Sequence, residues 1–350
     1  MSLKVVQVGC GKMSAYTMRY VLERQGELVG AYDMYEKIIG KDVSEIIGGE
    51  PIGVKIENIA QLDESLKKVK PDIAIITTKS LISSIYSVIE ILAKNHVNVV
   101  SICEELFYAW DSNPTVSKKI DDIAKEYGIT VTGSGYQDVS WGSLVTALAA
   151  TAASIQTIHG ISSYNLEDYG LETASMHGAG LSMEEFNKQI LEVNNVSDAE
   201  RDCLIAKGEF LPGYMWPVNG WIASALGLHV ANISQRAEAT TYSTDLYSNT
   251  LMKNIPSGHA TGLRTIVTAE TEEGITIITE CIGRVFSPDE KDINEWLVKG
   301  EPDMRIVMEN PATVEMTCAC AVNRLPDVVA AEPGYITSEK MQNLKFRLKF

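Results

Sequence analysis

The sequence predicts an α/β fold in which a doubly wound parallel sheet is followed by an α+β domain with an open mixed sheet. In the first 137 residues, short apolar runs alternate with segments of helical spacing, which is typical of a sheet buried on both faces. Further along, long segments alternate apolar and polar residues, which indicates strands with one solvated face. A chain of 350 residues has room for two domains. We expect them at residues 1–137 and 138–315, with residues 316–350 returning to the first domain.

The elements of the first domain follow one another as strand and helix. Pro71 marks the entry to a strong strand, PDIAIITT, and the other apolar runs are equally short. The predicted strands are residues 3–9, 27–33, 71–78, 96–103 and 128–135, and the predicted helices are residues 12–25, 80–94 and 114–127.

The second domain begins with helices and continues with long strands. Glu272-Glu273-Gly274 predicts a hairpin turn between two β-rich arms. A last helical segment, ended by Pro333-Gly334, is expected to pack back on the first domain. The predicted helices are residues 138–152, 183–193, 197–207 and 216–227, and the β-rich segments are residues 229–243, 263–286 and 304–310.

Composition excludes several classes of function. A formal net charge of -16 argues against nucleic acid as a partner and is compatible with a small cationic substrate. No apolar run is long enough to span a membrane, and the start of the chain does not resemble a signal peptide. The six cysteines include no CxxC pair and the five histidines lack metal-ligand spacing, so we expect no metal site and reduced thiols, as in a cytoplasm.

The segment VVQVGCGKMSAY, residues 5–16, predicts a dinucleotide-binding turn. Gly9 permits the tight turn, Gly11 lets the backbone approach a pyrophosphate, and Lys12 and Met13 open the following helix. Ser14 replaces the third glycine of the usual pattern but is small enough for close packing. This context of strand, glycine turn and helix is that of a Rossmann-type domain.

Asp33 ends the second predicted strand, 22 residues after Gly11. An acidic side chain there would accept hydrogen bonds from a ribose 2′-hydroxyl and repel a 2′-phosphate, which favours NAD over NADP. Lys37 and Lys41 follow closely and could soften that preference.

Polar residues at the ends of the next strands predict the nicotinamide half of the groove, because ligands of open α/β sheets lie outside the carboxyl ends of the strands. We expect Thr77, Thr78 and Cys103 to contribute there. Glu104 and Glu105 follow directly, and one of them should face the site. A carboxylate beside a nicotinamide could take a proton from a substrate ammonium and then activate water, but the pair could also only cap a helix.

The second domain offers candidates for substrate binding. Tyr164 and Tyr169 lie at the end of a predicted strand and could form a pocket wall with polar tips. His177 and His259 occur in glycine-containing loops. A substrate carboxylate would need a hydrogen-bond donor, and His259, Arg264 and Asn219 are the candidates.

Four segments together resemble the 2,4-diaminopentanoate dehydrogenases of anaerobic ornithine fermentation, a family related to dihydrodipicolinate reductases and native amine dehydrogenases. These segments are VGCGKM, CEELFYAW, TGSGYQDVSWG and VNRLPDVVAAEPGYIT. The resemblance implies NAD(P)-dependent oxidative deamination of 2,4-diaminopentanoate to 2-amino-4-oxopentanoate and ammonia, reversible as reductive amination. It also implies that Glu104 contacts the reacting amine, that Tyr164 and Tyr169 border the substrate, and that the protein is a homodimer formed through the second-domain sheet.

Two departures from related families leave alternatives open. The sequence has no adjacent His-His pair of the kind that dihydrodipicolinate reductases carry, and it has Ser134-Gly135-Tyr136 where amine dehydrogenases often have Asn-Pro-Gly. The alternatives are an imine reductase of the dihydrodipicolinate type and a dinucleotide-binding sensor without catalytic activity. A Glu104→Gln variant separates an enzyme, which should lose turnover, from a sensor, which should not.

Overall fold

The computed structural model describes residues 2–350, which form two compact units. Unit 1 runs to Ser143 and includes Ala312–Phe350, and unit 2 is Leu144–Pro311. The limits predicted from the sequence are residues 137/138 and 315/316. No helix of the described residues is long and apolar enough to cross a membrane.

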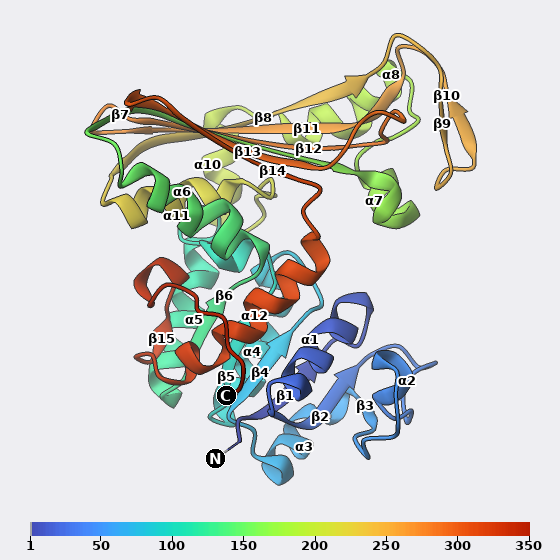
Figure 1. The fold of residues 1–350 in the computed structure, drawn as a ribbon, viewed down its shortest axis with the longest axis vertical. Coiled ribbons are helices and arrows are strands. Elements are labelled where there is room, and N and C mark those ends of the chain that lie inside the picture. The colour runs from blue at the N-terminus through green and yellow to red at the C-terminus, as the bar shows by residue number, and fades with distance from the viewer. Residues whose placement is uncertain (1) are drawn as a thin grey trace. The chain divides into compact units, whose positions relative to one another are not determined.

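Unit 1 is built on a seven-stranded parallel sheet in the order β15-β6-β5-β4-β1-β2-β3 (Figure 1). Its strands are β1 (Lys4–Val8), β2 (Glu27–Asp33), β3 (Ile56–Asn58), β4 (Ile73–Ile76), β5 (Asn98–Ser101), β6 (Thr130–Gly133) and β15 (Gly334–Tyr335). Its helices are α1 (Lys12–Glu23), α2 (Ser44–Ile47), α3 (Leu62–Val69), α4 (Ile82–Lys94), α5 (Pro114–Tyr127) and α12 (Thr313–Val329), with short 3₁₀ turns η1 (Ile59–Gln61), η2 (Glu105–Phe107) and η6 (Ser338–Lys340).

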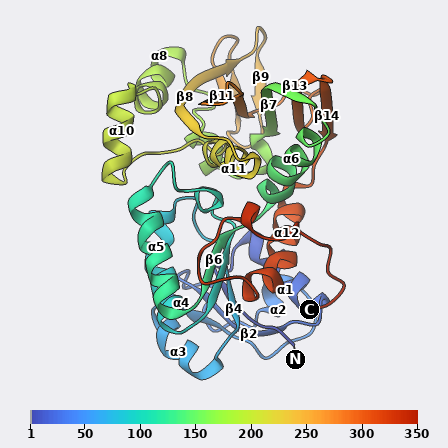
Figure 2. The same ribbon diagram turned by 90° about the vertical axis from the view of Figure 1, so that its left-hand side faces the viewer.

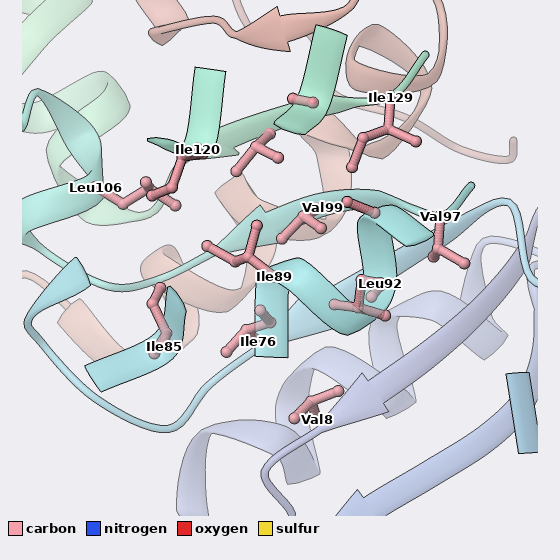
Figure 3. Packing of buried hydrophobic residues seen from close by; sticks show 14 of the residues in the cluster. Val8, Ile76, Ile85, Ile89, Leu92, Val97, Val99, Leu106, Ile120 and Ile129 are labelled. Atoms are coloured by element: carbon pink, nitrogen blue, oxygen red, sulfur yellow. The ribbon is translucent and has the colours of Figure 1, made fainter. Parts of the chain in front are cut away.

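Both faces of this sheet are covered, as the continuous apolar runs predicted. Val5 and Ile75 pack with α12 on one face, whereas Val6 and Ile76 face α3, α4 and α5 on the other. Figure 2 shows α12 on one side of the sheet and α4 and α5 on the other. Figure 3 shows the second layer, where Ile85, Ile89 and Leu92 of α4 lie beside Ile76 and Val99. The predicted Rossmann-type fold class is confirmed.

The segment predicted as a helix over residues 138–152 consists of a π-helix, η3 (Gln137–Ser143), followed by α6 (Leu144–Ala149). Asp138 in η3 is fully buried and accepts hydrogen bonds from Ser134 Oγ (2.8 Å) and from Arg324 Nε of α12 (3.0 Å). Ser143 Oγ donates to the Asp138 carbonyl (3.0 Å). The contact with Arg324, 186 residues further along the chain, explains why helical periodicity alone did not reveal the wider turn.

Unit 2 contains a six-stranded mixed sheet in the order β14-β13-β7-β12-β11-β8 and a small β10-β9 hairpin. The strands are β7 (Ser154–Asn165), β8 (Val230–Thr241), β9 (Leu246–Ser248), β10 (Lys253–Ile255), β11 (Ala260–Thr271), β12 (Thr276–Arg284), β13 (Ile293–Glu301) and β14 (Met304–Glu309). The helices are α6, α7 (Gly170–Met176), α8 (Met183–Phe186), α9 (Glu192–Asn194), α10 (Asp198–Lys207) and α11 (Trp216–Leu226), with a 3₁₀ turn η4 (Leu166–Asp168) and a second π-helix η5 (Asn187–Leu191).

In this sheet β7 and β12 are parallel, and the other neighbouring strands are antiparallel. The predicted hairpin joins β11 to β12, with Gly274 at a φ of 81° that favours glycine. Helices α6 and α11 cover one face of the sheet (Figure 1). The predicted α+β domain with an open mixed sheet is confirmed.

Candidate active site

The glycine turn after β1 leaves room for a phosphate group. Gly9 has a φ of 88°, and a Cβ atom there would lie 2.6 Å from Thr78 Cγ2 and 3.1 Å from the Thr77 carbonyl oxygen. A Cβ atom on Gly11 would meet no heavy atom within 4 Å, so open space lies before the first turn of α1. No side chain caps that helix. The residues present therefore fit a pyrophosphate at the N-terminus of α1.

A buried polar cluster holds the turn in place. Gln7, completely buried in β1, donates through Nε2 to the Gly9 carbonyl (3.0 Å) and to Thr77 Oγ1 (2.9 Å). Thr77 Oγ1 also donates to the Gly9 carbonyl (3.0 Å), and Thr17 Oγ1 donates to Gln7 Oε1 (2.7 Å). Thr77 thus shapes the turn with its side chain. Sequence reasoning missed Gln7, whose signal was a polar residue inside an apolar strand.

Asp33 is fixed beside the same turn. Its carboxylate accepts hydrogen bonds from the backbone N–H of Cys10 (2.6 Å) and of Tyr35 (2.8 Å). Each oxygen keeps acceptor capacity for a ribose hydroxyl. Lys41 forms an ion pair with Glu45 (3.4 Å), and Lys37 lies over the Tyr35 ring, so the described contacts of neither lysine include Asp33.

The other predicted cofactor residues fall into two groups. Lys12 and Thr78 are exposed, and the carbonyl of Met13 accepts a hydrogen bond from the Cys318 thiol (3.3 Å). These three lie around the turn, where the prediction put them. The side chain of Cys103, in contrast, is completely buried in the core of unit 1, so only its backbone could reach a ligand.

Two adjacent glutamates at the end of β5 have different surroundings. Glu105 is 3% exposed, and its carboxylate accepts hydrogen bonds from Ile82 N–H at the start of α4 (2.8 Å) and from Ser112 Oγ (2.7 Å). Glu104 is half-buried. Burial raises the pKa of its carboxyl, and a hydrogen bond with Ser80 lowers the pKa only in part. Burial also raises the pKa of Glu105, whose carboxylate caps the start of α4. Glu104 is therefore the candidate acid of the pair.

In unit 2 the structure brings Tyr164, Tyr169 and His177 together. The Tyr164 hydroxyl and His177 Nε2 are 2.7 Å apart, and the rings of Tyr164 and Tyr169 meet edge to face at 5.3 Å. His177 Nδ1 lies 2.8 Å from the Thr173 carbonyl, so Nδ1 carries the proton and Nε2 accepts from Tyr164. Burial lowers the pKa of His177, which keeps the ring neutral.

His259 joins the same end of the sheet through the backbone. Gly180 N–H donates to the Ala260 carbonyl (2.7 Å), and Ala260 N–H donates to the Leu181 carbonyl (3.0 Å). The loops that carry His177 and His259 are therefore hydrogen-bonded neighbours, although more than 80 residues separate the two histidines in the sequence. The four predicted substrate residues gather at one end of the sheet.

Two of the three candidate hydrogen-bond donors to a substrate carboxylate already bind other groups of the protein. Asn219 is completely buried and donates to the carbonyls of Val267 (3.3 Å) and Ile277 (3.1 Å), which ties α11 to the sheet. Arg264 forms ion pairs with Glu280 (2.6 Å) and Glu238 (3.3 Å). His259 is the candidate that remains. Residues 2–350 contain no group of three or more His, Cys, Asp or Glu side chains placed to hold a metal ion.

A parallel sheet with a glycine turn after β1, an acid at the end of β2 and a second acid after β5 is typical of a dinucleotide-dependent oxidoreductase. An amine dehydrogenase from Mycobacterium smegmatis has the same structure, with a TM-score of 0.87 and 31% sequence identity over 100% of this chain and 99% of that one. Residues 211–346 match the model of the 2,4-diaminopentanoate dehydrogenase C-terminal domain. The chain belongs to the family of amine dehydrogenases and 2,4-diaminopentanoate dehydrogenases, as the sequence resemblance indicated.

A further relative and a further solved structure are also similar to this chain. The 2,4-diaminopentanoate dehydrogenase of Acetoanaerobium sticklandii is 25% identical over 343 residues, covering 96% of this chain and 92% of that protein. A probable dehydrogenase from Thermotoga maritima has a TM-score of 0.59 at 11% identity over 97% of this chain and 92% of its own, so the fold alone is shared.

Proposed function

We propose that this protein oxidatively deaminates 2,4-diaminopentanoate to 2-amino-4-oxopentanoate and ammonia with NAD as the preferred acceptor, and that it runs the reverse reductive amination at high ammonia. In this role it would act in ornithine degradation. The family, shared over the whole chain, supports the reaction class. The observation that carries the proposal is Glu104, a half-buried acid with a raised pKa at the carboxyl end of β5.

Glu104 would move the protons of the reaction. Its carboxylate accepts a proton from the ammonium at C4, and the neutral amine that results can release hydride from C4. A bound nicotinamide would supply the acceptor for that hydride. After passing that proton to solvent, Glu104 would deprotonate the water that adds to the C4 iminium. It would then return this proton to the amino nitrogen of the resulting carbinolamine, so that ammonia leaves as the ketone forms. Because burial disfavours the ionised carboxylate, proton transfer from an ammonium to Glu104 costs less than it would to an exposed acid.

Asp33 supports the preference for NAD. Its two oxygens are oriented by backbone N–H groups of Cys10 and Tyr35, and a 2′-phosphate would meet a fixed negative charge. We expect Asp33→Ser to lower the kcat/KM ratio of NAD over NADP by about 10-fold or more. Initial rates with each cofactor measure this ratio, and an unchanged ratio would contradict the role of Asp33.

Tyr164, Tyr169, His177 and His259 are the proposed substrate-binding residues. The Tyr164–His177 hydrogen bond fixes the phenol, and the rings of Tyr164 and Tyr169 offer an apolar wall for a short carbon chain. His259 is the proposed donor to the substrate carboxylate, since Asn219 and Arg264 are engaged.

We further propose a cytoplasmic homodimer formed through the second-domain sheet. All six cysteines are free thiols, which suits a reducing compartment. The face of the sheet opposite α11 carries half-buried isoleucines, which suits an interface.

The deciding experiment is reduction of NAD or NADP by the purified protein with 2,4-diaminopentanoate, followed by absorbance of the reduced cofactor. Lysine and ornithine serve as controls. Turnover with the diaminopentanoate alone supports the proposal. If the protein binds the dinucleotide in a titration but shows no turnover, the proposed substrate is wrong, and a dinucleotide-binding sensor is the alternative.

A further inference from the structure

A buried side-chain amide follows β6 without a hydrogen-bond partner. Gln137 begins η3, four residues after the last residue of β6, and is 5% exposed. Its Nε2 is shielded from solvent, and no atom of residues 2–350 accepts a hydrogen bond from it. By contrast, the buried amide of Gln7 donates to the Gly9 carbonyl (3.0 Å) and to Thr77 Oγ1 (2.9 Å). Because a buried amide without a partner destabilises a fold, Gln137 is suited to a ligand that accepts its N–H groups.

The amide of Gln137 lies where the turn after β6 meets α12. A Cβ atom on Gly135 would lie 2.9 Å from Gln137 Oε1 and 3.1 Å from Thr317 Cγ2 of α12. The backbone N–H of Tyr136 donates to Thr317 Oγ1 (3.3 Å). These contacts hold the turn in place, so the position of Gln137 does not depend on hydrogen bonds of its own side chain.

This turn lies beside two parts of the candidate site. On one side, Gly133 at the end of β6 packs so closely on η2 that a Cβ atom there would lie 2.5 Å from the carbonyl carbon of Leu106, two residues after Glu104. On the other side, Cys318 of α12 donates through its thiol to the Met13 carbonyl in the first turn of α1 (3.3 Å). The turn after β6 is thus linked both to the proposed acid and to the helix start that fits a pyrophosphate.

The order of the strands places these parts along one edge of the sheet. The strands β1, β4, β5 and β6 are parallel neighbours in that order, so their carboxyl ends share an edge. With a pyrophosphate at the end of β1, the nicotinamide half of a dinucleotide extends along this edge towards β5, where Glu104 lies. Gln137 follows β6, on the far side of β5 from the pyrophosphate, where it can meet the outer end of the nicotinamide.

We propose that Gln137 donates through Nε2 to the carboxamide oxygen of the nicotinamide and thereby holds the ring in one orientation. The ring can rotate about its glycosidic bond, and each orientation presents a different face to the substrate. Half a turn moves the carboxamide to the other side of the ring, so one hydrogen bond to this group selects between the two orientations. The inference rests on the proposed function for its nicotinamide cofactor, but not for its amine substrate.

The test compares binding of NAD with binding of ADP-ribose, which lacks only the nicotinamide, by calorimetry. We expect Gln137→Met to lower the affinity for NAD by about 5- to 50-fold and to leave ADP-ribose within about 2-fold, because only the carboxamide loses its donor. Gln137→Glu, which replaces the donor with an acceptor, should also weaken NAD alone. No hydrogen bond of the free protein is lost in Gln137→Met, so its unfolding midpoint should stay or rise.

Thr130→Val is the matched control. Thr130 is 1% exposed at the amino end of β6, away from the cofactor edge, and donates through Oγ1 to the Glu332 carbonyl (2.9 Å). This variant should lose stability and keep both affinities, which separates a general weakening of β6 from the loss of a ligand contact.

The orientation of the bound ring has its own readout. Transferred nuclear Overhauser effects connect the anomeric proton of the ribose with the two ring protons that flank the glycosidic nitrogen. In the wild type one of these two effects should dominate, and in Gln137→Met they should become comparable. Two comparable effects in the wild type, or one dominant effect in both proteins, would overturn the role of Gln137 in orientation.

Three binding results would also overturn the inference. An unchanged affinity for NAD in Gln137→Met would mean that the amide binds an ordered water and not the ring, and an equal loss of NAD and ADP-ribose would indicate a structural role. Binding of neither ligand by the wild type would remove the cofactor site and the proposed function together. If the variant weakens NAD alone but the wild type does not oxidise 2,4-diaminopentanoate, the inference is supported and only the proposed substrate is wrong.

Discussion

Glu104 and Glu105 are chemically identical neighbours, and their surroundings alone separate their roles. Glu105 satisfies a backbone N–H of α4 and a serine hydroxyl, whereas Glu104 is half-buried beside Ser80. We expect Glu105→Ala to lower the free energy of unfolding by about 2–4 kcal/mol, because the Ile82 N–H loses its acceptor in the core. The folded variant should still turn over substrate.

Glu104→Ala should behave in the opposite way. It removes a carboxylate that burial disfavours, so the unfolding midpoint should stay or rise, while turnover falls by about 10²–10⁴-fold. Thermal unfolding and initial rates on both variants measure the contrast. Loss of turnover in Glu105→Ala at an unchanged unfolding midpoint would reverse the assignment.

The raised pKa of Asp111 predicts that the stability of the protein depends on pH. This pKa is raised from 3.8 to about 6, so the native state binds this proton more tightly than the unfolded chain does. The native state therefore loses stability as pH rises from about 4 to about 6, and the loss persists above that range. Asp111→Asn should equal the wild type near pH 3.5 and exceed it at pH 8 by on the order of 1–3 kcal/mol.

Denaturant unfolding at the two pH values measures this difference. A variant that is less stable than the wild type at pH 8 would mean that Asp111 has a stabilising partner in the native protein.

At the scale of elements, the π-helix η3 depends on α12, which lies far away in the sequence. Arg324 of α12 and Asp138 of η3 form an ion pair (2.8 Å) in which both side chains are about 2% exposed or less. Arg324 also donates to the Gln342 carbonyl, which ties the C-terminal segment to the same point (2.6 Å). Arg324→Met should cost about 3–5 kcal/mol, because it leaves Asp138 buried without its partner.

Arg19 in α1 gives the matched control for Arg324→Met. It pairs with Glu23 at 3.8 Å, and both side chains are about half exposed. Arg19→Met should therefore cost about 1 kcal/mol or less. Equal losses in the two variants, measured by denaturant unfolding, would show that the buried pair does not hold η3.

The sequence predicted those elements whose pattern is local. The buried strands β1, β2, β4, β5 and β6 follow from apolar runs, and the glycine turn follows from its position between strand and helix. Strands β3 and β15 have three and two residues, too few for a pattern, and each forms by pairing with a strand already in place. The π-helix η3 was not predicted because the ion pair that holds it joins two segments far apart in the sequence.

The site shows the same limit. Gly9, Gly11, Asp33 and Glu104 could be singled out because each lies at the end of a strand or within three residues after one. The contacts that occupy Asn219 and Arg264 could not be predicted, since their partners lie on strands that are distant in the sequence. Among residues 2–350, Asp111 lacks a cationic partner because of where the fold places the lysines and arginines, and no local sequence pattern predicts their positions.

At the scale of the whole molecule, the open face of the second-domain sheet is the proposed dimer interface. In β12 the residues at 277, 279, 281 and 283 are buried on the α11 side, whereas Ile278, Glu280 and Ile282 lie on the opposite face. Glu280 is neutralised there by Arg264 (2.6 Å) and His159 (2.8 Å). Isoleucines beside paired charges make a surface that a second copy can cover at little electrostatic cost.

We therefore expect Ile278→Lys to convert the dimer to monomers at micromolar concentration, since two symmetry-related lysines would be buried in one interface. Val193→Lys, at a position 56% exposed on α9, is the control and should leave the assembly intact. Sedimentation velocity measures both. A monomeric wild type, or a dimer that survives Ile278→Lys, would show that this face of the sheet does not hold two copies together, and another surface would then have to account for any dimer.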